Sequence, residues 1–184
     1  MEQEAKKEDS EFYGVQIESE RILFIMDKSG SMSSPVSYAD GTRIENLKIE
    51  FKKMLDDLDS KKRLGVLWFA GNETYPRKGV SLNTTTFQKG LKKHIDEVNA
   101  GGGTPINEAI HYAFEHILIK YKVDTIYLLS DGAPTDAKPD KICEAIRAMN
   151  LDAFIKIHTI SIGQESGFLK QVARENYGTY NEVK

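Results

Sequence analysis

Short apolar runs that alternate with amphipathic segments constrain the fold of this chain more than any other feature. Five consecutive apolar side chains at residues 22–26 are typical of a strand that is buried on both faces. Residues 43–59 instead carry apolar side chains at helical spacing, which predicts a helix with one buried face. The alternation continues, so the sequence predicts further strands at residues 64–70, 125–129, 154–162 and 179–183, and further helices at residues 87–98, 105–121, 141–149 and 167–176.

Strands that alternate with helices predict an α/β fold with helices on both faces of a mostly parallel sheet. We expect a Rossmann-like arrangement whose central sheet has about six strands. The segment at residues 72–80 is expected to form an antiparallel edge strand, because Pro76 is tolerated at an edge and not in a central strand. The 184 residues suffice for a single core, so we expect one domain at residues 20–184 after a charged tail or linker at residues 1–19.

Composition excludes several classes of function. Lys and Arg number 25 and Asp and Glu 28, and the net charge of −3 excludes a strongly basic nucleic-acid binder and a polybasic membrane-surface protein. No apolar run reaches the roughly 18 residues of a membrane span, and residues 1–11 lack the apolar core of a signal peptide. We expect a soluble monomer that contacts neither nucleic acid nor membrane. The chain also fits a piece of a longer protein, and its localisation stays unknown.

Cysteine and histidine give no sign of a catalytic or zinc site. Cys143 is the only cysteine and has apolar neighbours at helical spacing, so a small core residue is expected there. The histidines are not spaced as a ligand pair on one helical face. Structural or solvent-facing roles are therefore expected for His94, His111, His116 and His158.

Oxygen-rich loops with glycine follow two of the predicted strands, and a third lies between them in the sequence. The motif Asp27-x-Ser29-x-Ser31 follows residues 22–26 directly. Asp131, in a Ser-Asp-Gly segment, follows a later strand, and Thr104 belongs to the segment Gly-Gly-Gly-Thr-Pro. Ligands of open α/β sheets bind beyond the carboxyl ends of the strands. We therefore expect these three loops to meet at one edge of the sheet.

Two carboxylates and several hydroxyls, without histidine or cysteine, form a set of hard oxygen ligands. Such a set suits Mg²⁺, with Mn²⁺ and Ca²⁺ as alternatives, and argues against Zn²⁺ and Cu²⁺. Each loop alone is also an ordinary structural signal. Thr104 suits the N-cap of a helix whose first residue is Pro105, and Ser-Asp-Gly is typical of a turn. Their joint occurrence at strand ends is more specific than any one of them.

These motifs make the chain similar to von Willebrand factor type A domains over residues 20–183. The resemblance implies a metal-ion-dependent adhesion site (MIDAS). In it, Ser29, Ser31 and Thr104 would supply hydroxyl ligands. The carboxylates of Asp27 and Asp131 would bind directly or through water. The resemblance also implies a protein-interaction module rather than an enzyme, in which an acidic side chain of a partner protein completes the coordination of the metal.

Two features near these motifs bear on metal and partner binding. Lys28 departs from the family, which often has an apolar or small residue at this position. Its ammonium would either weaken metal binding modestly or point into solvent. Residues 32–42, which include Tyr38, would lie on the rim of the site and either shape the choice of partner or form an ordinary surface loop.

Two alternatives stay open. In the first, Asp27 is the nucleophile of a Mg²⁺-dependent phosphoryl-transfer or hydrolase domain. Such enzymes usually place a second acid two residues later, where this chain has Ser29, and the sequence contains no glycine-rich nucleotide-binding motif. The second alternative is a structural scaffold with a vestigial metal site, against which the complete set of five oxygen ligands argues.

Overall fold

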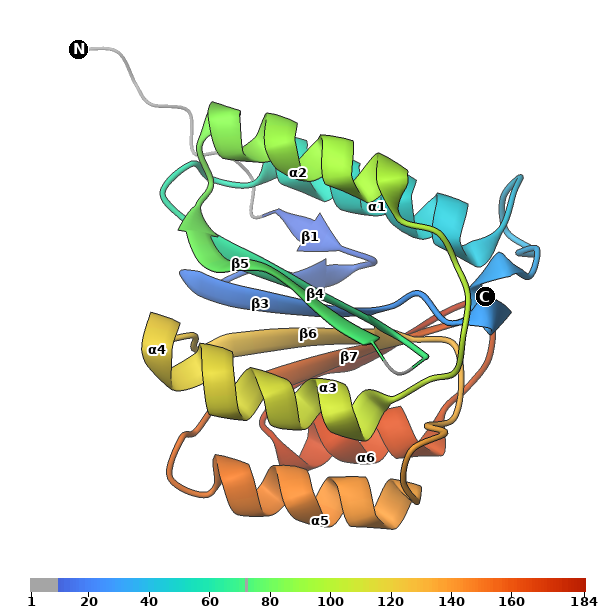
Figure 1. The fold of residues 1–184 in the computed structure, drawn as a ribbon, viewed down its shortest axis with the longest axis vertical. Coiled ribbons are helices and arrows are strands. Elements are labelled where there is room, and N and C mark those ends of the chain that lie inside the picture. Colours follow the sequence, from blue (N-terminus) through green and yellow to red (C-terminus); the bar gives the residue numbers. More distant parts are fainter. Residues whose placement is uncertain (1–9, 72) are drawn as a thin grey trace.

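The computed structural model describes residues 10–71 and 73–184, and its centre is a twisted sheet (Figure 1). In this part of the chain the sheet has six strands in the order β5-β4-β3-β6-β7-β8. Five of them run parallel: β3 (Arg21–Asp27), β4 (Arg63–Ala70), β6 (Thr125–Ser130), β7 (Lys156–Ile162) and β8 (Tyr180–Val183). The edge strand β5 (Glu73–Leu82) pairs with β4 in the antiparallel sense. The expected α/β fold, with its mostly parallel sheet and one antiparallel edge strand, is confirmed.

Helices cover both faces of the sheet, as Figure 1 shows. The helices α1 (Arg43–Asp57) and α2 (Thr85–Glu97) lie on one face. The other face carries α3 (Ile106–Tyr112), the π-helix η2 (Ala113–Leu118), α4 (Ile119–Tyr121), α5 (Pro139–Asn150) and α6 (Gly167–Glu175).

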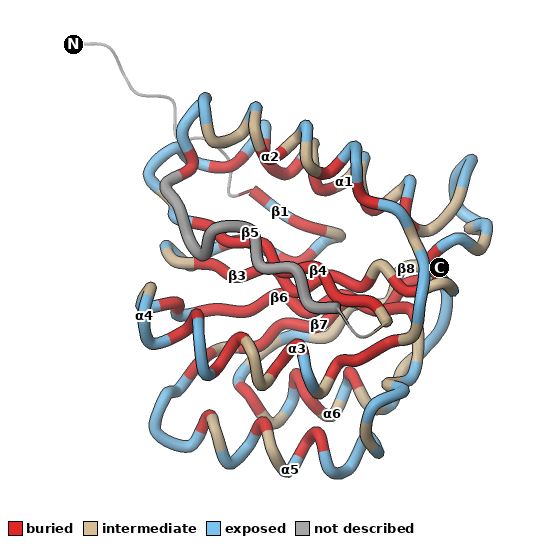
Figure 2. The backbone as a smooth tube through the Cα atoms, in the orientation of Figure 1, coloured by how far each residue is buried: buried red, intermediate tan, exposed pale blue. Residues whose placement is uncertain are grey.

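The central strand β3 shows why the sheet needs both layers of helices. Phe24 and its second neighbours along the strand belong to the apolar cluster under α1 and α2, whereas Leu23 and Ile25 belong to the cluster under α3, α5 and α6. Side chains alternate between faces along a strand, so a continuous apolar run is stable only when both faces are covered. Figure 2 shows the result, with buried residues along the strands and exposed residues on the outer sides of the helices.

The N-terminal boundary differs from the expectation. The strands β1 (Glu11–Phe12) and β2 (Val15–Gln16) form an antiparallel hairpin. The ring of Phe12 is fully buried, and its centroid lies 5.4 Å from that of Phe24 and 5.6 Å from that of Phe51. The expected tail at residues 1–19 is therefore corrected from Ser10 onward, because this segment packs on the core, while residues 1–9 lie outside the described residues.

Candidate metal centre

The predicted ligands follow strands that are neighbours in the sheet. Asp27 is the last residue of β3, and Asp131 comes directly after β6, which pairs with β3 in parallel. Parallel neighbours end at the same edge, so the loops after both strands lie together at the right-hand edge in Figure 1. The sheet topology, rather than proximity in the sequence, therefore brings the two carboxylates to one place.

Asp27 is fully buried, and both of its carboxylate oxygens accept hydrogen bonds. The amide of Ser29 donates to Oδ1 at 2.6 Å, and the hydroxyl of Ser130 donates to Oδ2 at 2.5 Å. Burial, which disfavours the charged form, raises the pKa of Asp27 to about 6 even though these hydrogen bonds act in the opposite direction. The charge of Asp131 nearby adds to the rise. A cation at this place would relieve both effects.

A chain of short contacts links Ser29, Ser31 and Asp131. The hydroxyl oxygens of the two serines lie 3.1 Å apart, and the Ser31 hydroxyl donates to Oδ1 of Asp131 at 2.7 Å. The short 3₁₀ helix η1 (Gly30–Ser33) sets this geometry, since its turn is closed by a hydrogen bond from Met32 N to Ser29 O and the Met32 side chain is buried. Four of the five predicted ligands thus lie in one hydrogen-bonded cluster.

The fifth predicted ligand, Thr104, is buried. Its loop is joined by backbone hydrogen bonds to the loop that follows β3. Gly30 N donates to Gly102 O at 2.8 Å, and Gly101 N donates to Lys28 O at 2.8 Å. Among the described residues, no hydrogen bond joins the Thr104 hydroxyl to the other four ligands. The structure therefore brings the loop of Thr104 to the cluster through its backbone.

The start of the following helix differs from the expectation that Thr104 caps it. The helix α3 begins at Ile106, and Pro105 occupies the N-cap position without a side-chain cap. The cap comes instead from Asp136, whose carboxylate accepts hydrogen bonds from the amides of Asn107 at 3.3 Å and Glu108 at 2.8 Å. The Thr104 side chain is consequently not used for capping.

The glycine-rich loop is fixed in place at Gly102. This residue has a φ of +79°, and a Cβ on it would lie 2.7 Å from the backbone nitrogen of Gly71. Only glycine allows both this backbone conformation and this close approach of two chains. The glycine-rich loop is therefore held against the end of β4 at this residue.

Arg43 is the site residue that sequence reasoning missed. Its Nη1 donates to Oδ2 of Asp131 at 2.5 Å, so the second oxygen of that buried carboxylate is paired with a partly buried guanidinium. A Cβ on Gly163, whose φ is +79°, would lie 2.7 Å from Nη2 of Arg43, so the guanidinium packs against glycine backbone. Arg43 is the first residue of a predicted helix, and nothing in the sequence around it indicates that it contacts the residue after β6.

Other predicted features have the structural roles expected of them. Cys143 is buried, and burial raises the pKa of its thiol to about 11. The His158 ring stacks on Tyr127, and its Nδ1 lies 2.8 Å from the Thr179 hydroxyl, while burial lowers its pKa. Within the described ranges, no group of three or more His, Cys, Asp or Glu side chains is arranged to hold a metal.

The donor set fits a hard divalent cation. Two buried carboxylates and two serine hydroxyls converge at one strand end, and oxygen ligands of this kind are those that Mg²⁺, Mn²⁺ and Ca²⁺ prefer. The guanidinium of Arg43 already neutralises part of the negative charge. The remaining negative charge comes mainly from Asp27, which has no ion-pair partner among the described residues.

Comparison with known proteins is consistent with this geometry. A family model of the von Willebrand factor type A domain matches residues 22–181. The chain belongs to this family. Inter-alpha-trypsin inhibitor heavy chain H2 of Homo sapiens is 30% identical in an alignment of length 174 that covers 88% of this chain and 18% of that protein. The VWA domain described here thus spans less than a fifth of the length of that relative.

Solved structures show the same fold. A von Willebrand factor type A structure from Catenulispora acidiphila matches with a TM-score of 0.75 at 20% identity, over 90% of this chain and 39% of that one. Proximal thread matrix protein 1 from the mussel byssus, a structure with a zinc-occupied MIDAS motif, matches with a TM-score of 0.64 at 19% identity, over 89% and 41%. VWA domains generally mediate protein interactions. Within the described part of the chain, no helix has the length and apolarity that a membrane span requires.

Proposed function

We propose that this VWA domain binds protein partners through a divalent metal ion, with Mg²⁺ as the preferred ion. The ligands would be the hydroxyls of Ser29, Ser31 and Thr104, with the carboxylates of Asp27 and Asp131 binding directly or through water. The partner would supply an acidic side chain that completes the coordination. The domain would therefore act as an adhesion or scaffold module rather than as an enzyme.

One observation carries this proposal: the buried, unneutralised carboxylate of Asp27 lies in the same hydrogen-bonded cluster as Ser29 and Ser31. A buried charge without a partner costs several kcal/mol in a typical protein interior. A bound cation removes that cost. In a purely structural site the buried charge would only lower the stability of the protein. The zinc in the MIDAS motif of the mussel protein belongs to a structure that shares this fold, which supports a metal at the corresponding place.

The phosphoryl-transfer alternative has less support from the geometry. A nucleophilic carboxylate needs a free oxygen facing its substrate. Both oxygens of Asp27 instead accept hydrogen bonds from within the chain, from Ser29 and Ser130. We therefore expect no turnover of phosphoesters or nucleotides by the purified domain.

Calorimetric titration of the chelator-treated protein with Mg²⁺ tests the metal. We expect one binding event in the wild type and a loss of at least about tenfold in affinity for Asp27→Asn, because a charged ligand is replaced by a neutral one. Asp136→Asn is the matched control, since Asp136 is an acid of the same sheet edge that caps α3. Equal Mg²⁺ binding by the wild type and Asp27→Asn would refute the proposed ligand set.

Peptides selected from a random library on the Mg²⁺-loaded domain test the partner chemistry. We expect an essential Asp or Glu in the selected peptides, release by EDTA, and weaker capture by Thr104→Ala. Peptides that bind equally well in EDTA, or after replacement of their acidic residue by its amide, would contradict a metal-dependent interface.

A further inference from the structure

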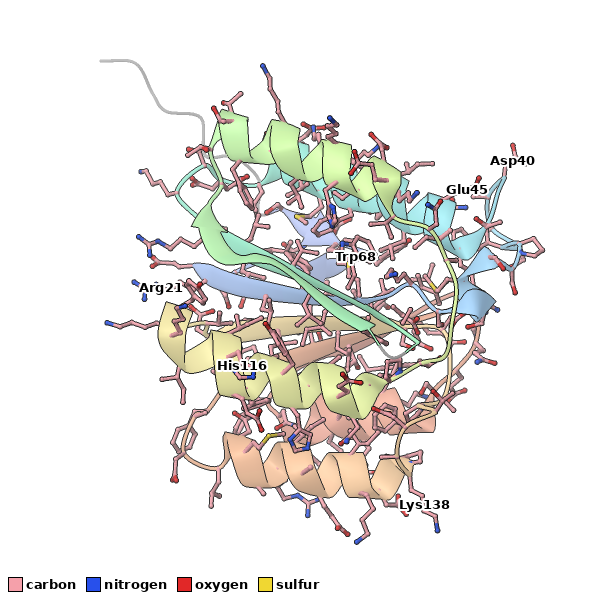
Figure 3. The ribbon with its side chains drawn as sticks, in the orientation of Figure 1. Arg21, Asp40, Glu45, Trp68, His116 and Lys138 are labelled. Carbon is pink, nitrogen blue, oxygen red and sulfur yellow. The ribbon has the colours of Figure 1, made fainter. Side chains whose placement is uncertain are left out.

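A pocket of about 300 Å³ lies beside the candidate metal site but is built from other side chains. It is formed where α2 and the segment after it pack over β4, and Figure 3 shows Trp68 between this strand and that helix. The pocket touches the metal loops only through the residue after Asp27. Its lining consists of Lys28, Trp68, His94, Glu97, Val98 and Asn99.

Two nitrogen atoms of this lining are buried and have no hydrogen-bond partner among the described residues. They are Nε1 of Trp68 and Nε2 of His94. The indole of Trp68 is 1% exposed, and its N–H can only donate. A buried donor without an acceptor costs free energy, so such groups normally face water or a ligand. The lining therefore includes a buried donor that has no acceptor among the described residues.

The donors of the lining indicate which group fits. Besides the indole N–H of Trp68, His94 is able to donate from Nε2. The one acidic side chain of the lining, Glu97, is exposed. Val98 is buried and supplies an apolar surface. A small anionic acceptor with an apolar stem matches this combination better than a cation or a neutral donor.

We propose that this pocket is a second ligand site that binds a carboxylate group, which accepts hydrogen bonds from Trp68 Nε1 and His94 Nε2. The carboxylate belongs either to a small organic acid or to an acidic side chain of a peptide, and both sources share this chemistry. The site does not require the metal, so its test is separate from that of the proposed function.

The single tryptophan makes the test direct, because the protein has one indole N–H signal. Metal-free, ¹⁵N-labelled protein in EDTA is titrated with sodium acetate, with acetamide, and with sodium chloride at the same ionic strength. We expect a saturable downfield shift of the indole proton with acetate alone. A blocked glycine peptide with one central glutamate, compared with its glutamine counterpart, separates the two sources: tighter binding than acetate identifies a peptide side chain, and equal or weaker binding identifies a small acid.

His94→Leu tests the second donor. It should weaken acetate binding by about fivefold, which is the typical worth of one hydrogen bond. His116→Leu is the matched control, because His116 lies on the opposite side of the sheet (Figure 3). A urea unfolding curve establishes that each variant is folded. If the indole signal does not respond to acetate, responds equally to acetamide, or keeps its affinity in His94→Leu, the pocket holds water alone and the proposal is wrong.

Discussion

Replacing Asp27 with asparagine should stabilise the metal-free protein, although it removes a predicted ligand. Asparagine keeps the shape of the side chain, and its Oδ1 still accepts from the amide of Ser29. Its amide donates to the hydroxyl of Ser130, which is able to accept as well as donate. The substitution therefore removes the buried charge and preserves the surrounding hydrogen bonds.

The magnitude follows from the pKa. Burial raises the pKa of Asp27 from 3.8 to about 6, so the folded state holds the proton more tightly than the unfolded state. The wild-type free energy of unfolding consequently falls as the pH rises from about 4 to about 6, and levels off above this range. The free energy of unfolding of the asparagine variant does not fall in this way, because asparagine does not ionise. At neutral pH the variant should be more stable by about 3 kcal/mol, and near pH 4 by much less.

Urea unfolding in EDTA at several pH values measures this difference, with Asp136→Asn as the control for losing one acid at the same edge. Mg²⁺ at a concentration that saturates the wild type should then stabilise it, since a ligand that binds only the folded state raises its stability, and should stabilise Asp27→Asn less. A variant that is less stable than the wild type in EDTA at neutral pH would refute the reasoning. A stability difference that does not depend on pH would refute it as well.

Two further substitutions test the loops around the cluster. Gly102→Ala should destabilise the protein by about 1–3 kcal/mol in thermal unfolding, because the φ of this residue is +79° and a Cβ on it would clash with Gly71. Gly101→Ala is the control. A Cβ on Gly101 meets nothing within 4 Å, so the stability of this variant should stay close to that of the wild type. Arg43→Gln removes the cation paired with Asp131 and should tighten Mg²⁺ binding severalfold in calorimetry. Weaker binding would instead show that Arg43 orients this carboxylate for the metal.

Much of the fold could be predicted because its signals are local. The apolar run of β3 and the helical spacing in α1 are each readable within one window of sequence. The hairpin of β1 and β2 escaped the sequence reasoning for the same reason. It has two residues per strand, and its stability comes from packing Phe12 against Phe24 and Phe51, far along the chain.

The candidate site also contains residues that a local sequence pattern predicts and residues that only distant contacts place there. Asp27, Ser29 and Ser31 form a compact motif, and the end of a later strand predicts where Asp131 lies. Arg43 could not be predicted, because its partner is 88 residues away. The cap of α3 was also assigned to the wrong residue, since a side chain from a distant loop competes for amides that a local threonine would otherwise accept from. Local rules describe what a residue is able to do, and the tertiary structure decides which of several partners it has.

The position of Asp27 is itself an argument for binding. A structural carboxylate in a core is usually paired with a cation, as Asp131 is with Arg43. Asp27 accepts hydrogen bonds only from neutral donors, and burial of its charge raises its pKa. Groups that destabilise the free protein are typical of functional sites, where a ligand restores the lost free energy. With two carboxylates and one guanidinium, the cluster has a net charge of −1, so a bound divalent ion would leave it positive. That residual positive charge is the physical reason to expect an acidic partner rather than a basic one.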